Sequence, residues 1–228
     1  MRSLIVRFFD SEGPGILEPI LREKGYQITY HDAYKKGLQL MPKAHLVFDR
    51  IILLGGPQSV YDPELEDFFE PYLELVENAI SQPDKKVIGV CLGSQIIAKA
   101  LGGEVFPGEK GPETGFGYAN VLKPNQGVFE GISEISIPTF HLHGDTFTIP
   151  NGAELLLSSE MYPNQMFSYK NKIYAIQCHF EPTIPMLKVW EKIQAEFLKK
   201  GQGMGGNIEE QQPTMERFAK ILFQNILR

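Results

Sequence analysis

The sequence predicts an α/β fold in which a mostly parallel central sheet lies between two layers of helices. The first half alternates apolar, strand-like runs with stretches of helical spacing, a pattern typical of a parallel sheet covered on both faces. The run Lys86–Val90 is apolar nearly throughout, as expected of a strand buried on both sides. The 228 residues, 43% of them hydrophobic, suit one domain with a sizeable core. We expect a single domain over residues 1–228, with C-terminal helices over 184–228 packed on it.

Four apolar runs in the first half are predicted to be strands of this sheet: Leu4–Phe9, Gln27–His31, Arg50–Leu54 and Lys86–Val90. A first helix is expected between Pro14, which the first turn tolerates, and Gly25, a typical stop. A second helix is expected to begin at Asp62-Pro63, an N-cap followed by proline, and Pro71 is expected to kink or split it. A third, short helix is predicted over Ser94–Leu101.

The second half is predicted to add shorter strands separated by turns: Gly115–Leu122, Ile135–Leu142, Glu154–Ser158, Met166–Tyr169 and Ile173–Gln177. Asn171-Lys172 is predicted to be a hairpin turn between the last two of these strands. Two helices follow, at about Ile184–Lys199 and Thr214–Leu227, joined by a glycine-rich link over 201–206.

Composition and charge exclude several classes of protein. The net charge of −6 leaves no general basic face, so we expect no nucleic-acid partner. The apolar runs are too short for a membrane span, and the first ten residues become charged too soon for a secretory signal. Two cysteines argue against a disulfide-built fold and are typical of the reducing cytosol. We therefore expect a cytoplasmic protein without a membrane partner.

The run Val87–Ile97, V-I-G-V-C-L-G-S-Q-I-I, has a glycine two residues before Cys91 and another two residues after it. A nucleophile presented on a sharp turn between a strand and a helix needs small neighbours at these positions, as in the serine elbow G-x-S-x-G. The helix that follows aims its N-terminal N–H groups at the sulfur, which favours the reactive thiolate. The N–H of Leu92 is placed to stabilise an oxyanion. The alternative is a buried, inert cysteine, the usual state of free cysteines.

A catalytic cysteine needs a base, and the base needs a group that orients it. His179 follows the last predicted strand and Glu181 lies two residues on, so both side chains point the same way in an extended segment. The alternative is an ordinary strand-end histidine beside a solvated glutamate. His141, His143 and Asp145, together with this pair, suggest a metal, yet no H-E-x-x-H or C-x-x-C spacing is present. We therefore predict no metal and no cofactor.

Three motifs in order resemble the class I glutamine amidotransferase family, the triad-type glutaminases. They are L-L-G-G-P at 53–57, G-V-C-L-G-S-Q at 89–95 and Q-C-H-F-E at 177–181, and the resemblance spans roughly residues 45–185. G-G-P-Q-S-V-Y-D, H-L-H-G-D-T-F-T-I-P and S-S-E-M-Y-P-N-Q-M-F are similar to the glutaminase domain of GMP synthetase. The chain therefore looks like a stand-alone member of the family. The resemblance implies a three-layer α/β/α sandwich with a flavodoxin-like, mostly parallel sheet and a nucleophile elbow.

The resemblance also implies a mechanism and a set of site residues. Cys91 attacks the γ-amide carbon of glutamine and forms a γ-glutamyl thioester. His179 delivers a proton to the leaving ammonia and then activates water, while Glu181 orients His179. The N–H groups of Leu92 and Gly56 are implied to form the oxyanion hole, and each donor is worth about 3 kcal/mol in the transition state. The implied substrate contacts are Gln95, His143, Gly144 and Asp145.

Two residues depart from the family's pattern. Phe180 stands where the family has a proline between the histidine and the glutamate, which removes a backbone restraint but keeps the i, i+2 geometry. Cys178 stands where an aromatic residue is common. We expect Cys178 to point away from His179, to be structural and not to pair with Cys91.

Three functions stay open. A glutaminase would supply ammonia to an acceptor, and because no P-loop or synthase module is visible, the acceptor would be a separate synthase chain. A γ-glutamyl peptidase or hydrolase would use the same thioester on a γ-glutamyl amine or peptide and would need no partner. Gln95 and the H-G-D loop are expected to bind the γ-glutamyl part that both substrates share, so they do not separate these two functions. A non-catalytic binding protein is disfavoured by the intact triad. The oligomeric state, a homodimer included, is left open.

Overall fold

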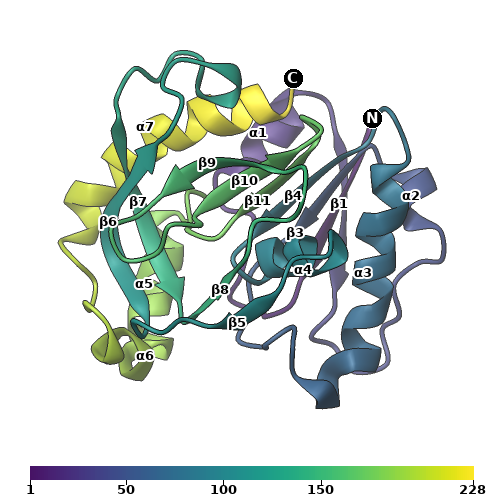
Figure 1. Ribbon diagram of the computed structural model, residues 1–228, viewed down its shortest axis with the longest axis horizontal. Helices are drawn as coiled ribbons and strands as arrows, with labels where there is room; N and C mark the ends of the chain where they lie inside the picture. Colours follow the sequence, from purple (N-terminus) through teal and green to yellow (C-terminus); the bar gives the residue numbers. More distant parts are fainter.

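The computed structural model describes residues 1–228 and places helices on both faces of a nine-stranded sheet (Figure 1). The strands are β1 Arg2–Arg7, β2 Gln27–Asp32, β3 Arg50–Leu53, β4 Lys86–Val90, β5 Val105–Pro107, β6 Glu113–Val121, β7 Ser136–His143, β8 Asp145–Phe147, β9 Glu154–Ser158, β10 Met166–Tyr169 and β11 Ile173–Ile176. The α-helices are α1 Leu17–Glu23, α2 Ala44–Val47, α3 Glu66–Ile80, α4 Leu92–Ala100, α5 Ile184–Ile193, α6 Ala195–Lys200 and α7 Ile208–Ile226. Two short 3-10 helices are η1 Pro63–Leu65 and η2 Gly127–Phe129.

The large sheet changes from parallel to antiparallel at β11. Its strand order is β2-β1-β3-β4-β11-β10-β9-β6-β7, and the first five of these strands are paired in parallel. The other four extend the sheet through antiparallel pairs, and β5 and β8 form a small separate ribbon. The predicted α/β class is confirmed, and the strand–helix alternation of the first half produced the parallel region as expected.

Two hydrophobic cores lie on opposite faces of the parallel strands. Ile5 and Ile52 face a core shared with α1 and α7, whereas Leu4 and Ile51 face a core shared with α3 and α4. Because successive strand residues point to opposite faces, a strand buried on both sides must be apolar at nearly every position. This requirement explains the apolar run Val87–Val90 within β4.

Helix boundaries differ from the prediction where proline was used to place them. The first helix begins at Leu17 and not at Pro14, because Pro14 lies in a preceding turn whose carbonyl accepts the N–H of Leu17. The second predicted helix starts as the 3-10 helix η1. The side chain of Asp62 caps η1 by accepting the N–H of Glu64. Pro71 does not split α3, which continues through it to Ile80.

The C-terminal region and one turn also differ. The predicted helix over 184–199 is divided at Gln194 into α5 and α6. The last helix starts at Ile208, well before Thr214, because the side chain of Asn207 accepts the N–H of Glu210 and caps it. The β10–β11 turn has positive φ angles at Lys170 and Asn171, one position earlier than predicted.

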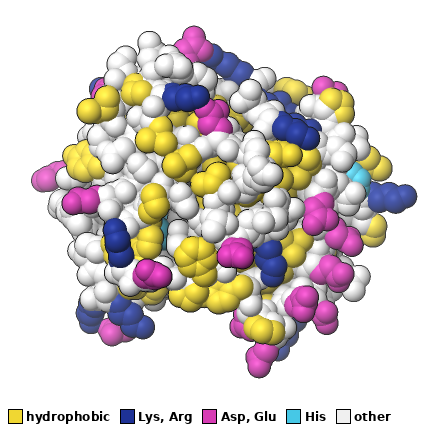
Figure 2. Space-filling model, in the orientation of Figure 1, with side chains coloured by type: hydrophobic (Ala, Val, Ile, Leu, Met, Phe, Trp, Pro, Cys, Tyr) yellow, Lys and Arg dark blue, Asp and Glu magenta, His cyan; other side chains and the backbone are white.

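Surface charge is mixed on the face drawn in Figure 2. Acidic and basic side chains are interspersed around its edge, and acidic side chains gather over α3. None of the helices combines the length and the apolar character needed to cross a membrane.

Candidate active site

Cys91 stands at the tip of a sharp turn between β4 and α4. Its backbone has φ 51° and ψ −111°, a region that residues other than glycine rarely adopt. A Cβ added at Gly89 would lie 2.3 Å from the carbonyl oxygen of Gly93, and one added at Gly93 would lie 2.0 Å from that of Leu53. Backbone atoms cannot give way, so both positions require glycine. Helix α4 begins at Leu92, two residues earlier than predicted, which places the thiol directly at the helix N-terminus.

The thiol lines a cavity of about 230 Å³ at the carboxyl ends of the parallel strands. Cys91 is 8% exposed, and its Sγ lies 3.7 Å from the carbonyl oxygen of Leu142 on β7. The cavity brings together with Cys91 the predicted site residues Gly56, Gln95, His143, Gly144 and Asp145. Segments that are far apart in the sequence therefore meet around one sulfur atom.

His179 and Glu181 form a buried pair behind this cavity. The Nδ1–H of His179 donates to Oε1 of Glu181 over 2.6 Å, and both residues are at most 1% exposed. The N–H of Phe180 donates to Oε2 of the same carboxylate over 3.1 Å. A proline at position 180 could not make this bond, so the departure from the family's pattern supplies an extra anchor for Glu181.

The second ring nitrogen of His179, Nε2, is buried and has no hydrogen-bond partner. Burial lowers the pKa of His179, but the carboxylate of Glu181 and the thiol of Cys91 outweigh burial and hold that pKa well above its usual value. Trp190 of α5 packs edge-on against the imidazole, with ring centroids 5.1 Å apart. The geometry thus provides an imidazole that can carry a proton beside the thiol, shielded from water.

The two residues whose N–H groups are the predicted oxyanion donors, Gly56 and Leu92, are neighbours in the structure. A Cβ on Gly56 would lie 3.1 Å from Cδ2 of Leu92. The N–H of Gly56 makes no backbone hydrogen bond, and that of Leu92 opens a helix, where no carbonyl lies one turn back to accept it.

The predicted substrate contacts already have partners within the protein. The side-chain amide of Gln95 donates to Oε1 of Gln177 over 3.2 Å. Asp145 accepts from the hydroxyl groups of Ser59 and Tyr61, and burial raises its pKa. This network holds the Asp145 carboxyl at one end of the cavity.

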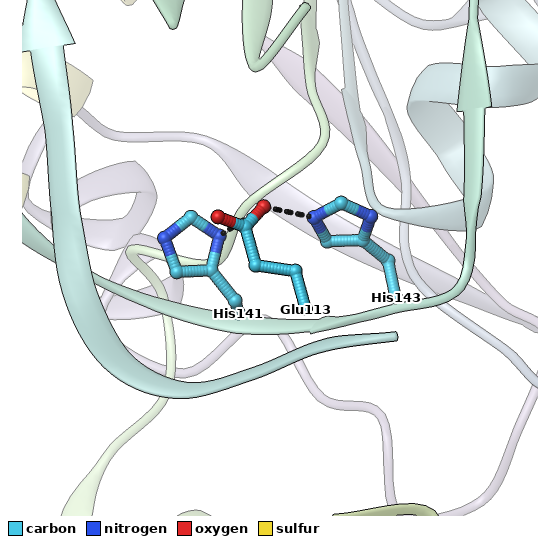
Figure 3. Close-up of side chains that lie close together, drawn as sticks. All are labelled: Glu113, His141 and His143. Carbon is cyan, nitrogen blue, oxygen red and sulfur yellow. Dashed lines mark hydrogen bonds and ion pairs between the residues drawn. The ribbon is translucent and has the colours of Figure 1, made fainter. Parts of the chain in front are cut away.

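His143 faces Glu113 of β6, which also lies beside His141 (Figure 3). Burial lowers the pKa of His141 to about 3. Burial acts to raise the pKa of Glu113, but the hydrogen bond from His143 and the charge interaction with His141 outweigh it and leave that pKa below its usual value. His143 is therefore bound into a buried polar cluster while its loop lines the cavity.

Both cysteines are free. Cys178 is fully buried, and burial raises its pKa.

Glu12 is a functional candidate that no sequence motif marks. It lines the same cavity as Cys91 and is 5% exposed. Donor atoms of Glu12, His179 and Glu181 lie within 4.8 Å of one another, and the Glu12 carboxyl has no hydrogen bond or ion pair with another side chain. Burial raises the pKa of Glu12 to about 7, with a lowering effect from His179 and a raising effect from Glu181. The one feature of the sequence that could have indicated Glu12 is its position shortly after β1. The carboxyl ends of parallel strands lie at the same edge of a sheet, which is where ligands bind in such folds.

Glu12→Gln is expected to make the protein more stable at alkaline pH. The folded state keeps the Glu12 proton up to about pH 7, whereas the unfolded chain loses it near its ordinary pKa. The wild type therefore loses stability between about pH 4.5 and pH 7, by about 3 kcal/mol in total. Urea unfolding from pH 4 to pH 8.5 measures the difference, with the exposed Glu23→Gln as control. Parallel stability curves for wild type and Glu12→Gln would contradict a buried, protonated Glu12.

The sequence profile of the family described as glutamine amidotransferase class-I matches residues 16–185. The glutamine amidotransferase-like protein YfeJ of Salmonella typhimurium is 32% identical over 187 residues, which cover 79% of this chain and 76% of that protein. GMP synthase (glutamine-hydrolyzing) of Thermosipho melanesiensis is 28% identical over 97% of this chain, which spans only 40% of that enzyme. γ-Glutamyl peptidase 4 of Arabidopsis thaliana is 35% identical over 43% of this chain and 41% of that protein.

The fold matches solved structures over its whole length. The crystal structure of a glutamine amidotransferase from Thermotoga maritima superposes with a TM-score of 0.82 at 30% identity, covering 100% of this chain and 96% of that one. The family match includes the elbow at Cys91 and the pair His179–Glu181. The chain therefore belongs to the class I glutamine amidotransferase family.

Proposed function

We propose that the protein hydrolyses the γ-amide of glutamine through a γ-glutamyl thioester on Cys91 and releases ammonia. The observation that carries the proposal is the strained elbow, which presents the Cys91 thiol to a small polar cavity beside the buried His179–Glu181 pair. A strained backbone at a cavity-lining nucleophile is costly and persists where it serves function.

The first half of the reaction makes the thioester. The Cys91 thiolate attacks the γ-carbonyl carbon, and the negative charge on the carbonyl oxygen is stabilised by the N–H groups of Leu92 and Gly56. His179, protonated and held by Glu181, gives its Nε2 proton to the departing nitrogen. The C–N bond breaks, ammonia leaves, and the γ-glutamyl group stays on sulfur.

The second half hydrolyses the thioester. His179, now neutral, takes a proton from a water molecule that attacks the same carbon, and the same two N–H groups bind the second oxyanion. The C–S bond breaks, glutamate leaves, and the thiolate and the imidazolium are restored. Gln95 and the loop 143–145 hold the amino-acid end of the substrate throughout.

A γ-glutamyl peptidase or hydrolase is the second candidate, supported by the similarity to γ-glutamyl peptidase 4 of Arabidopsis. The chemistry at Cys91 would be the same, with an amine in place of ammonia as the leaving group. The cavity of about 230 Å³ lies below the usual range for ligand pockets of about 300 to 1,000 Å³. A space of this size favours free glutamine over a peptide.

The whole chain over 1–228 is proposed to act as one glutaminase unit that delivers ammonia to a separate synthase chain. GMP synthase of Thermosipho melanesiensis matches this chain over only 40% of its length.

The protein is expected to turn over glutamine faster than γ-glutamyl dipeptides. Per mole of enzyme, the rate of ammonia release from glutamine should exceed the rate at which a dipeptide releases its free amino acid. The test is a coupled glutamate dehydrogenase assay with glutamine, beside chromatographic detection of amine release from γ-glutamyl-alanine, each with wild type and Cys91→Ala. Fast turnover of the dipeptide and none of glutamine would overturn the glutaminase and support the peptidase. Equal background from both proteins would overturn both. A rise in glutamine turnover on adding a candidate synthase would identify the ammonia acceptor.

A further inference from the structure

Strand β7 carries a second cluster of reactive groups next to the thiol. His141 and His143 point to one side of the strand because they are two residues apart, and the carbonyl of Leu142 between them contacts Cys91. On the neighbouring strand β6, Glu113 is the register partner of His143, and Gly115 is that of His141. Figure 3 shows the Glu113 carboxyl between the two imidazole rings.

We propose that Glu113, His141 and His143 bind a divalent first-row transition metal ion, with Zn²⁺ as the best match. Oε2 of Glu113 lies 3.1 Å from Nε2 of His143 and 3.3 Å from Nδ1 of His141, and the three donor atoms lie within 4.8 Å of one another. Tetrahedral Zn²⁺, with bonds of about 2.1 Å, separates its ligand atoms by about 3.4 Å. Two histidines and one glutamate are a known ligand set of catalytic zinc sites.

The hydrogen bonds around the cluster allow a metal ion to take the place of the proton between Nε2 of His143 and Oε2 of Glu113. Nδ1 of His143 lies 3.0 Å from the carbonyl oxygen of Asp145, which only accepts, so Nδ1 carries the hydrogen. In the neutral ring Nε2 is then a lone pair, and it faces Glu113. Nδ1 of His141 is buried without a hydrogen-bond partner although it lies near the same carboxylate. A cation satisfies all three groups at once.

The surroundings have the features of a supported metal site. Metal-binding histidines usually donate their other N–H to a carbonyl or carboxylate, and ligand carboxylates are themselves hydrogen-bonded. The bond from His143 to Asp145 fills the first role. The second is filled by Gln165, whose amide donates to Oε2 of Glu113 over 2.7 Å. Both bonds fix the direction of a ligand before any ion arrives.

The cluster has an approach of its own. Glu113 and His141 line a cavity of about 750 Å³, together with Thr114 and Gln202, whereas His143 lines the cavity at Cys91. Three protein ligands leave one position of a tetrahedral ion for water or a small ligand. In the proposed site this fourth position faces the cavity lined by Glu113 and His141. The ion would tie β6 to β7 and so hold the strand whose Leu142 carbonyl contacts the nucleophile.

The prediction of no metal rested on local spacing, which cannot show this site. Glu113 is separated from the histidines by η2 and lies on a different strand. Asp145, the acidic neighbour considered from sequence, supplies only its backbone carbonyl to the cluster.

Isothermal titration with Zn²⁺ is the test, carried out on Cys91→Ala so that the thiol beside His179 cannot be a ligand. We expect one Zn²⁺ per chain and a higher midpoint of thermal unfolding when it is bound. Glu113→Gln and His141→Gln in the same background should each weaken binding at least about tenfold, the smallest factor expected even for loss of an outer partner. His45→Gln, on α2, should bind as tightly as the parent.

Three results would overturn the site. They are no saturable binding, equal affinity in all variants, or a thiolate charge-transfer band in the Co²⁺-substituted protein, which would place the ion on Cys178. In the first case the cluster is only a hydrogen-bonded pair of His143 and Glu113. If His141→Gln does not fold, the Zn²⁺ affinity of the near-isosteric Glu113→Gln decides whether the site exists. None of these readouts uses catalytic activity, so they stand apart from the proposed glutaminase reaction.

Discussion

Cys91→Ala is expected to abolish release of ammonia from glutamine, with kcat/KM lowered by at least about 10⁴-fold. In the proposed mechanism the sulfur is the only atom of the site that forms a covalent bond to the substrate, and alanine cannot replace it. The oxyanion donors and the binding groups remain, so a small residual rate over water is expected. Steady-state assays at saturating glutamine, with the fold checked by circular dichroism, measure the loss.

Cys178→Ala provides the matched control. Cys178 is also buried and free, but its thiol does not line the cavity at Cys91. Activity within a few-fold of wild type is expected, with some loss of stability from the missing sulfur. Selective labelling of wild type by iodoacetamide at neutral pH should modify Cys91 and spare Cys178. Comparable labelling rates at the two cysteines, or an active Cys91→Ala, would exclude Cys91 as the nucleophile.

Glu181→Gln is expected to lower kcat by about 10⁴-fold with little change in stability. Glu181 accepts the Nδ1–H of His179 over 2.6 Å, which leaves Nε2 free to exchange a proton with the thiol. A glutamine side chain can turn its NH₂ toward Nδ1 and stabilise the opposite tautomer, with the hydrogen on Nε2. The imidazole then cannot take the proton of the thiol, and its charged form loses its carboxylate partner.

The pH profile separates this effect from simple unfolding. The carboxylate helps to hold the pKa of His179 above its usual value, so its removal should lower the pKa of the imidazolium. The fraction of protonated His179 then falls at a lower pH, and the alkaline limb of kcat should shift toward acid. Glu191→Gln, at an exposed glutamate of α5, is the control and should leave both rate and profile unchanged. A loss below about tenfold would show that Glu181 does not orient the base.

Much of the site could be predicted because its parts are local in sequence. The elbow needs Gly89, Cys91 and Gly93 within five positions, and the steric reason for each glycine lies in the same turn or in the adjacent strand. The pair His179 and Glu181 follows from the two-residue period of an extended chain. Gly56 lies in the loop that follows β3, the strand that pairs with β4, so its place beside Cys91 follows from the parallel order of the sheet.

Other features depend on contacts that no local pattern contains. Glu12 reaches the cavity only because β1 and β4 both pair with β3 and end at the same edge of the sheet. Trp190 covers His179 because α5 brings its ring against both His179 and Phe140 of β7. Pro14 lies in a turn before α1 and not in its first turn. Pro71 does not split α3, because packing of the helix's apolar face outweighs the local preference of a single proline.

By itself, the sequence determined the α/β class, and it predicted the turn that carries Cys91 and the pairing of His179 with Glu181. These depend on strand and helix periods and on steric limits within a few residues. Only the tertiary structure decided which side chains surround the thiol and which pKa values shift, and only it brought Glu113 between His141 and His143. Burial and the approach of distant strands set the local dielectric and the donor geometry, and neither is encoded in the spacing of neighbouring residues.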